Sequence, residues 1–184
     1  MTRVKVSKFC LCSISRITLT TSLLLCFCCP GDLIAATRGD IDEWLQAHNN
    51  YRLLHGAATL AWSVRLATSA QAYAETCSAT HSGSGHGENM AWASYDMGRR
   101  AVVKMWYDEA LLYDFSNPGF DSATGHFTQL LWKGTMEIGC GHTESCVKEG
   151  SGMKNVWVCQ YNPPGNYHGE FAENVLPAGS APSI

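Results

Sequence analysis

Gly125-His-Phe-Thr-Gln-Leu-Leu-Trp132 carries more information about this chain than any other segment. It puts His126 at the head of an apolar run. It therefore predicts a short helix over residues 126–132 whose apolar side chains lock into the core. A second specific segment lies downstream, Cys159-Gln-Tyr-Asn-Pro-Pro-Gly-Asn166. Chance is a poor explanation for both, so the residues around His126 are the first candidates for function.

The N-terminal region has the composition of a secretory signal. A basic start is followed by an apolar run at residues 17–29 and by the small residues Ala35 and Ala36. This order predicts a signal peptide over residues 1–36 and a single domain over residues 37–184. A retained signal anchor is the alternative, although the apolar run is shorter than the roughly 20 residues that span a bilayer.

Cysteine usage agrees with cleavage of that leader. The chain has nine cysteines, and five of them lie within residues 1–36. The four that remain are Cys77, Cys140, Cys146 and Cys159. An even set in a secreted domain predicts two disulfides, but four cysteines allow three pairings and spacing alone does not choose among them.

Charge excludes two classes of partner. Residues 37–184 contain nine Lys and Arg against fifteen Asp and Glu, a formal net charge of −6. No basic run survives in this part of the chain, so nucleic acid is not an expected partner. Attraction to anionic lipid is not expected for the same reason. We expect a monomer or a weak dimer.

Apolar periodicity outlines the secondary structure. Helices are predicted from Asp40 to about residue 54, from Ser63 to about residue 77, over residues 98–113 and over residues 126–132. Strands are predicted over residues 136–141 and 155–161, and residues 81–89 read as a polar glycine loop. Helices interspersed with few strands predict a layered α/β fold around a small antiparallel sheet.

Five ordered motifs together resemble the CAP superfamily of cysteine-rich secretory, antigen 5 and pathogenesis-related class 1 proteins, which share the SCP domain. They are His48-Asn49-x-x-Arg52, Gly87-Glu-Asn-Met90, Trp106-x-x-Glu109 and the two segments at residues 125–132 and 159–166. The resemblance covers residues 41–171. Residues 113–120, followed by Gly125 and His126, look most like fungal secreted members associated with sterol and fatty-acid export.

The resemblance implies a three-layer α-β-α sandwich with a small antiparallel sheet. It also implies the disulfides Cys77–Cys140 and Cys146–Cys159.

The resemblance further implies a cleft in which His81, Glu88, Glu109 and His126 converge. Imidazole nitrogen and carboxylate oxygen are ligand types that suit Zn²⁺ or a similar divalent cation. The alternative is a hydrogen-bonded polar cluster that holds loop to helix without a metal. No cofactor is required by the sequence. His86 is an extra histidine in the same loop, whereas His55, His142 and His168 look like surface residues.

Three functions compete. The resemblance favours a secreted, extracellular protein that binds sterol or fatty-acid lipids, with the first helix (Trp44, Leu45, Leu53 and Leu54) among the candidate walls. An extracellular defence or virulence protein that recognises a protein partner is the first alternative. A metal-dependent hydrolase that uses the His and Glu cleft is the second. Ser82 lies beside His81 but in no nucleophile-elbow pattern, so we predict no catalytic residues and no enzyme.

Overall fold

The computed structural model describes residues 36–146 and 152–180. The predicted signal peptide, apart from Ala36, lies outside these residues. The elements follow in the order α1 (Arg38–Leu54), β1 (Ala61–Trp62), α2 (Val64–Ala74), β2 (Gly87–Ala93), α3 (Arg99–Asp108), the 3₁₀ turn η1 (Glu109–Leu111), α4 (Gly125–Leu131), β3 (Glu137–Thr143), β4 (Asn155–Asn162) and α5 (Phe171–Asn174). Among the described residues, no helix has the length and apolarity needed to cross a membrane.

A capping box starts α1. The Thr37 hydroxyl accepts a hydrogen bond from the Asp40 amide at 3.3 Å, and the Asp40 carboxylate accepts one from the Thr37 amide at 3.0 Å. The sequence predicts Asp40 as the cap residue, whereas Asp40 occupies the third helical position and Thr37 is the cap. The reciprocal pair satisfies amides that a helix start leaves without partners.

Four strands form one mixed sheet in the order β1-β3-β4-β2. β3, β4 and β2 pair antiparallel, and the short β1 pairs parallel with β3. The expected antiparallel sheet is therefore correct for three strands and wrong for the edge strand β1. The sequence does not predict strand β2, because this segment contains no β-branched residue and its first part reads as the glycine loop.

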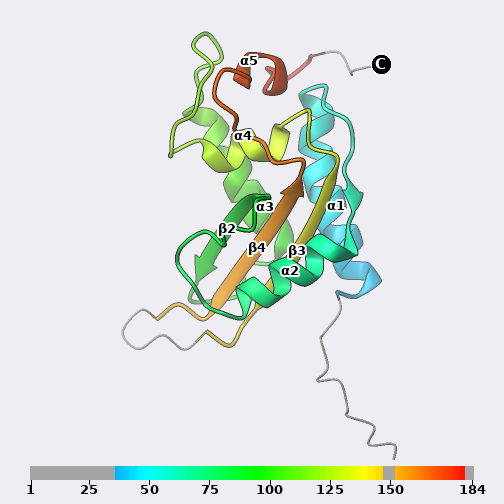
Figure 1. Ribbon diagram of the computed structural model, residues 1–184, viewed down its shortest axis with the longest axis vertical. Coiled ribbons are helices and arrows are strands. Elements are labelled where there is room, and N and C mark those ends of the chain that lie inside the picture. Colours follow the sequence, from blue (N-terminus) through cyan, green and yellow to red (C-terminus); the bar gives the residue numbers. More distant parts are fainter. Residues whose placement is uncertain (1–35, 147–151, 181–184) are drawn as a thin grey trace, which may run out of the picture. The chain divides into compact units, whose positions relative to one another are not determined.

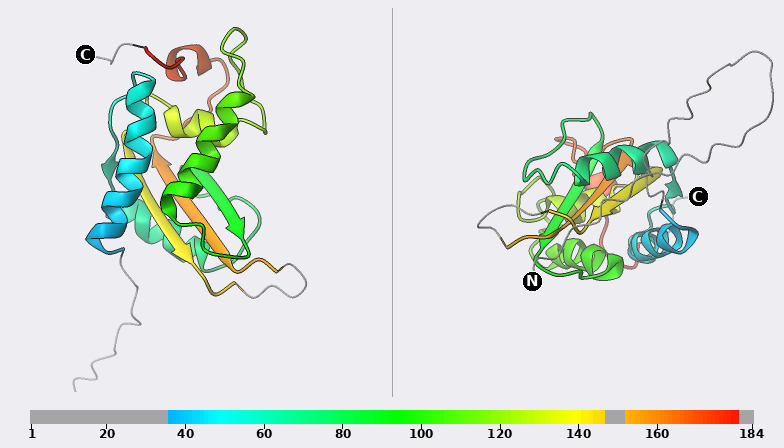
Figure 2. Two further views of the ribbon diagram at one scale, coloured as in Figure 1. Left: turned by 180° about the vertical axis from the view of Figure 1, so that it is seen from behind. Right: turned by 90° about the horizontal axis from the view of Figure 1, so that it is seen from below.

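The sheet separates two helical layers, which makes the expected α-β-α sandwich (Figure 1). Helix α2 covers one face, while α1, α3 and α4 cover the other (Figure 2). Alternation along β4 supplies both cores. Trp157, Cys159 and Tyr161 join the larger core, which contains side chains of α1, α3 and α4, and Val156 and Val158 join the smaller core under α2.

Two glycines let α2 lie directly on β3. A Cβ atom on Gly139 would stand 2.1 Å from the backbone nitrogen of Ala67, and one on Gly141 would stand 2.3 Å from the Cα of Gln71. Both glycines face α2 because residues two apart on a strand share a face. Any side chain at either position would push the helix away from the sheet.

All four expected cysteines form disulfides, but the pairing implied by the family resemblance is wrong. The structure joins Cys77 to Cys146 and Cys140 to Cys159. Cys140 and Cys159 lie directly opposite each other in the β3–β4 ladder and belong to the larger core. Cys146 belongs to the smaller core, with Cys77 packed against it. The sheet therefore separates Cys146 from Cys159 and rules out the expected bond.

Candidate functional site

His126 and Glu109 form a close polar pair at the start of α4. The Nδ1 atom of His126 lies 2.6 Å from Oε1 of Glu109. The other carboxylate oxygen accepts the backbone amides of His126 at 3.0 Å and Phe127 at 3.1 Å. Glu109 thus caps the first turn of α4 from the end of α3, where a negative charge is stabilised by the helix dipole. The indole of Trp106 stacks on the His126 ring.

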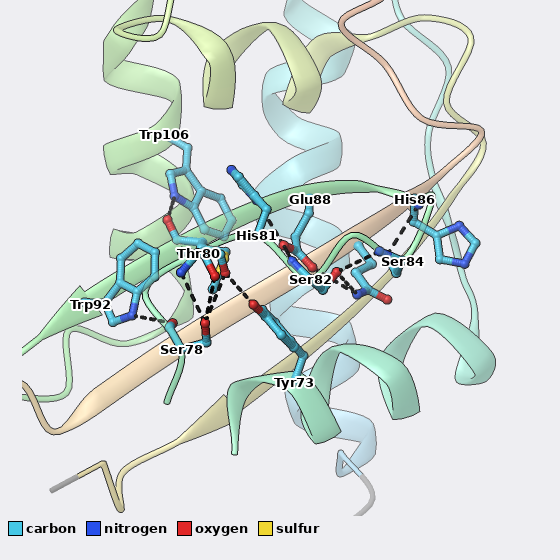
Figure 3. Close-up of polar contacts among 12 residues, drawn as sticks. Tyr73, Ser78, Thr80, His81, Ser82, Ser84, His86, Glu88, Trp92 and Trp106 are labelled. Atoms are coloured by element: carbon cyan, nitrogen blue, oxygen red, sulfur yellow. Dashed lines mark hydrogen bonds and ion pairs between the residues drawn. The ribbon is translucent and has the colours of Figure 1, made fainter. Parts of the chain in front are cut away.

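His81 and Glu88 form the second pair. The Nδ1 atom of His81 lies 2.9 Å from Oε1 of Glu88, which also accepts the Ser82 amide at 2.9 Å. The Nε2 group of Gln160 donates to the other Glu88 oxygen at 3.0 Å. Figure 3 shows the Glu88 carboxylate at the centre of these contacts. The His81 side chain is 67% exposed and the Glu88 side chain 4%.

Burial alone would raise the pKa of Glu88. Hydrogen bonds from Ser82, Gln160 and His81 outweigh burial and hold that pKa below its ordinary value. Glu88 is therefore a carboxylate at neutral pH, ready to hold the Nδ1–H of His81.

The four residues predicted to form a tetrad occur as two pairs. No hydrogen bond or ion pair joins His81–Glu88 to His126–Glu109 in the described part of the chain. Neighbouring strand residues project from opposite faces of a sheet. Glu88 accordingly lies on the face of Gln160, while Asn89 bonds the carbonyl of His126 in the other layer.

Among the described residues, no hydrogen bond reaches Nε2 of His81 or of His126. A histidine whose Nδ1–H is held by a carboxylate presents an unprotonated Nε2, which is the usual form of a metal-binding histidine. A structural Zn²⁺ site needs four such ligands and a catalytic site three. Across residues 36–146 and 152–180 no group of three or more His, Cys, Asp or Glu side chains is placed to hold a metal ion. The four side chains therefore offer two separate pairs of possible metal ligands, His81 with Glu88 and His126 with Glu109, and not one four-ligand site.

Ser82 is not arranged as a nucleophile. Its hydroxyl accepts the Ser84 amide at 3.3 Å and the Gln160 amide at 3.4 Å. The described contacts of that hydroxyl include no histidine, and the His81 Nδ1 atom is already held by Glu88. A serine nucleophile needs a base within hydrogen-bonding reach. Among the described residues, the base that the Ser82 side chain contacts is the Glu88 carboxylate. That carboxylate is already engaged with His81, the Ser82 amide and Gln160, and no described histidine is placed to take the hydroxyl proton.

Two of the three histidines expected at the surface, His55 and His142, are not exposed. His55 is buried and lies between Leu176 O at 2.6 Å and the Tyr107 hydroxyl at 3.0 Å. His142 is half-buried and stacks on Trp157. His168 is exposed as expected. His86 contacts Arg65 and points away from the His81–Glu88 pair (Figure 3).

A buried polar chain that sequence reasoning missed runs behind the His126 pair. The Asn89 amide donates to the carbonyl of His126 at 3.0 Å and to the Tyr161 hydroxyl at 3.2 Å. The Tyr161 hydroxyl lies 2.9 Å from Nε2 of His48, whose Nδ1 lies 2.9 Å from Trp44 O. A carbonyl only accepts, so Nδ1 carries the proton and Tyr161 donates to Nε2. The chain links four of the sequence motifs and fixes α1 and α4 against the sheet.

Arg52 is the other buried polar anchor. Its guanidinium donates to the carbonyls of Ala58, Leu130, Trp132 and Thr135 at 2.7–3.0 Å. Burial lowers the pKa of Arg52 to about 10, so the group remains charged. Two of its acceptors are carbonyls at the end of α4, where a cation opposes the helix dipole. The motif His48-Asn49-x-x-Arg52 in α1 therefore has a structural role.

The comparisons with known proteins agree with this architecture. The model of the cysteine-rich secretory protein family, called CAP, matches residues 45–161. The chain belongs to the CAP family.

Curated CAP relatives include fungal, human and plant proteins. Protein PRY2 of Saccharomyces cerevisiae is 47% identical over 135 residues, which are 71% of this chain and 39% of PRY2. The Golgi-associated plant pathogenesis-related protein 1 of Homo sapiens is 42% identical over 74% of this chain and 92% of its own length. The chain thus spans less than half of PRY2, and 53% of the Candida albicans Repressed by EFG1 protein 1.

Solved CAP structures share the fold. The structure entitled NaASP2 with Zn²⁺ covers 83% of this chain and 91% of its own, at a TM-score of 0.64 and 24% identity. BmVAL-1 covers 83% and 88%, at a TM-score of 0.60 and 25% identity. Each of these likenesses covers more than four fifths of the chain.

Proposed function

We propose that this CAP-domain protein is secreted and binds a sterol or a fatty acid. The observation that carries the proposal is a set of exposed apolar side chains on the segment between α3 and α4. Leu111 is 89% exposed, Leu112 68% and Phe120 60%. Adjacent apolar side chains in water favour a ligand that removes their surface from solvent. Residues 113–120 are also the part of the chain that resembles fungal members associated with sterol and fatty-acid export.

The same segment is anchored from beneath, so its outer side chains are held in place. Tyr113 is buried against Phe127, with ring centroids 5.5 Å apart. Phe115 packs edge-on against Phe127 at 6.2 Å and stacks with His55 at 6.4 Å. His55 follows the C-terminal end of α1, so this contact joins the segment to that helix. A preorganised apolar surface binds with a smaller ordering cost.

The end of α1 also exposes apolar side chains. Leu53 and Leu54 are each just over half exposed. Trp44, which the sequence places with them as a candidate wall, is buried in the larger core and stacks on Trp106. We therefore assign the lipid to the ends of α1 and α3 and not to the whole length of α1.

Saturable binding of radiolabelled cholesterol or palmitate to the purified protein tests lipid binding. The double variant Leu111→Ser, Leu112→Ser should weaken binding by about tenfold or more, since each tenfold corresponds to about 1.4 kcal/mol and one buried leucine contributes about 1.5–3 kcal/mol. Val64→Ser with Met136→Ser is the matched control, because both residues are exposed and lie outside the segment. Absence of saturable binding to either lipid contradicts the proposal and favours an interaction protein.

Secretion has its own support and its own test. Two disulfides in one domain are typical of an oxidising compartment. The basic and apolar leader has the order of a signal peptide. Mass spectrometry of the protein from culture medium should find a chain that begins near residue 37. An intracellular chain that retains residues 1–36 is the contrary result.

A further inference from the structure

A cavity of about 580 Å³ lies along the outer edge of β3, away from both His–Glu pairs and from the apolar segment. Its walls come from the N-terminal part of α1, with Asp40 and Trp44, and from the C-terminal part of α2, with Gln71 and Glu75. Figure 1 shows α1 and α2 on either side of β3. Ligand pockets typically measure about 300–1,000 Å³, so this space suits a ligand of several residues.

The floor of the cavity is a strand edge with only partial pairing. β1 ends at Trp62, and its last contact with β3 is the amide of Ser63 donating to Ile138 O at 2.8 Å. Four residues along, His142 uses the same edge: its amide donates to Oε1 of Gln71 at 2.9 Å, and its carbonyl accepts Nε2 of Gln71 at 3.0 Å. The Gln71 side chain thus pairs with β3 as the peptide unit of a neighbouring strand would.

Cys140 lies between Ile138 and His142 on β3. Its backbone N–H and C=O point to the same edge of the strand as theirs, because the backbone of a strand repeats every two residues. Cys140 stands opposite Cys159 in the ladder and shares a disulfide with it, so its side chain is committed to the core. Among the described residues no hydrogen bond reaches the backbone N–H or C=O of Cys140 from the cavity side. An unpaired stretch of strand edge is a template for another strand.

The walls give the cavity a negative charge. Asp40, Glu75 and Glu144 line it, and Arg99 is the one cationic side chain among the lining residues. Arg99 is already paired with Asp40 at 2.7 Å. The charged side chains that line the cavity therefore have a net charge of −2. A confined surface of this charge attracts cations and disfavours acidic ligands.

We propose that this cavity binds a short extended peptide segment that carries basic side chains. The segment would add to the sheet at the β3 edge, with its backbone paired to Cys140 and its alternate side chains directed at the acidic walls. This is strand addition, in which main-chain hydrogen bonds supply affinity and side chains supply specificity. The site is distinct from the proposed lipid surface and does not depend on it.

Nuclear magnetic resonance titration of the full chain tests the proposal. The probe is acetyl-Val-Lys-Val-Lys-Val-amide. Saturable shifts should appear at the backbone amides of residues 140–144. Glu144→Lys should weaken binding at least tenfold, and Glu144 is exposed, so the fold should tolerate the change. Glu75 is left unchanged, because its carboxylate accepts a hydrogen bond from Nε2 of Gln71 at 2.9 Å. Glu173→Lys is the control, because it is exposed on α5 outside the cavity lining.

Three further ligands separate strand addition from simple charge attraction. The same peptide with glutamate in place of lysine should not bind. A backbone N-methylated lysine peptide should also fail, since it keeps the charges but loses its hydrogen-bond donors. Equal binding of spermidine or of the N-methylated peptide overturns the proposal, as do shifts confined to the β2 edge. Complete absence of binding also overturns it and leaves Gln71 as protection of the strand edge.

Discussion

The hydroxyl of Tyr161 and Nε2 of His48 lie 2.9 Å apart in the buried centre of the molecule, where β4 meets α1. His48 is fully buried, and its other ring nitrogen is held by Trp44 O. Burial, assisted by the charge of Arg52 and opposed by the bond to Trp44, lowers the pKa of His48 from 6.5 to about 4. The histidine therefore folds as a neutral acceptor for Tyr161.

Acid should destabilise the protein through His48. In the unfolded chain this histidine takes up a proton near pH 6.5, whereas the folded chain resists it until about pH 4. The unfolded state binds more protons in this window, so stability is greatest above pH 6.5 and falls as the pH drops towards 4. The full effect is about 3 kcal/mol, from roughly 1.36 kcal/mol per pKa unit. Urea unfolding at four pH values from neutral down to about pH 4 measures it.

The variant His48→Gln separates this effect from general acid denaturation. Glutamine does not titrate, so the variant should lose less stability than the parent between neutral pH and about pH 4, even though it starts less stable. His55→Gln is the companion variant, because burial also lowers the pKa of His55. Parallel stability profiles for the parent and His48→Gln contradict the assignment.

Arg52 should be intolerant of a change to lysine. Lysine keeps the positive charge but cannot reach four carbonyls in the planar arrangement of a guanidinium. At least one buried carbonyl then loses its partner, and each such loss costs about 1–3 kcal/mol. Arg38→Lys is the matched control on the same helix, since Arg38 is exposed. Thermal unfolding should show a clear loss only for Arg52→Lys.

The close approach of α2 to β3 gives a third prediction. Gly139→Ala places a methyl group against the backbone of Ala67, and neither backbone can move without separating the layers. We expect a loss of about 1–3 kcal/mol, as for other overpacked cores. Gly119→Ala is the control, because a Cβ atom there meets nothing within 4 Å. Chemical denaturation of both variants compares them, and equal stabilities would contradict a direct contact between this helix and the strand.

How far the sequence predicts this fold depends on the range of the interactions involved. Helix α1 and strands β3 and β4 have strong local patterns and appear close to their expected ranges. Strand β2 has no such pattern, because its conformation comes from pairing with β4 far along the chain. The same limit explains the disulfides: Cys146 and Cys159 look close in sequence, but the face of the sheet that each occupies depends on register.

The candidate site is subject to the same limit, because its geometry depends on contacts between residues far apart in the sequence. The resemblance places His81, Glu88, Glu109 and His126 in one cleft, and in the structure His81 contacts Glu88 and His126 contacts Glu109. It does not reveal that the contacts form two separate pairs, because alternation along β2 depends on where the strand begins. Asn89, Tyr161 and His48 lie inside quoted motifs, yet only the tertiary structure shows that they form one hydrogen-bonded chain.

Disulfide mapping tests the observed pairing directly. Non-reducing proteolysis followed by mass spectrometry should yield linked peptides for Cys77–Cys146 and Cys140–Cys159. Removing the first bond should destabilise more than removing the second, because it spans 69 residues against 19. Loop-closure entropy gives about 4 and about 3 kcal/mol respectively. Urea unfolding of the paired Cys→Ser variants compares them, and a linked Cys77–Cys140 peptide would contradict the structure.

Two separate His–Glu pairs should bind divalent metal weakly and independently. Each pair offers one free imidazole nitrogen beside a carboxylate, which is fewer ligands than a tight Zn²⁺ site uses. Zn²⁺ titration followed by histidine chemical shifts should show His81 and His126 responding with different affinities. His81→Ala should leave the response of His126 unchanged, and His126→Ala should leave that of His81 unchanged. His168→Ala, which removes an exposed histidine outside both pairs, is the control. A single joint transition that either variant abolishes would show instead that the four residues converge on one ion, because only a shared site couples the two histidines.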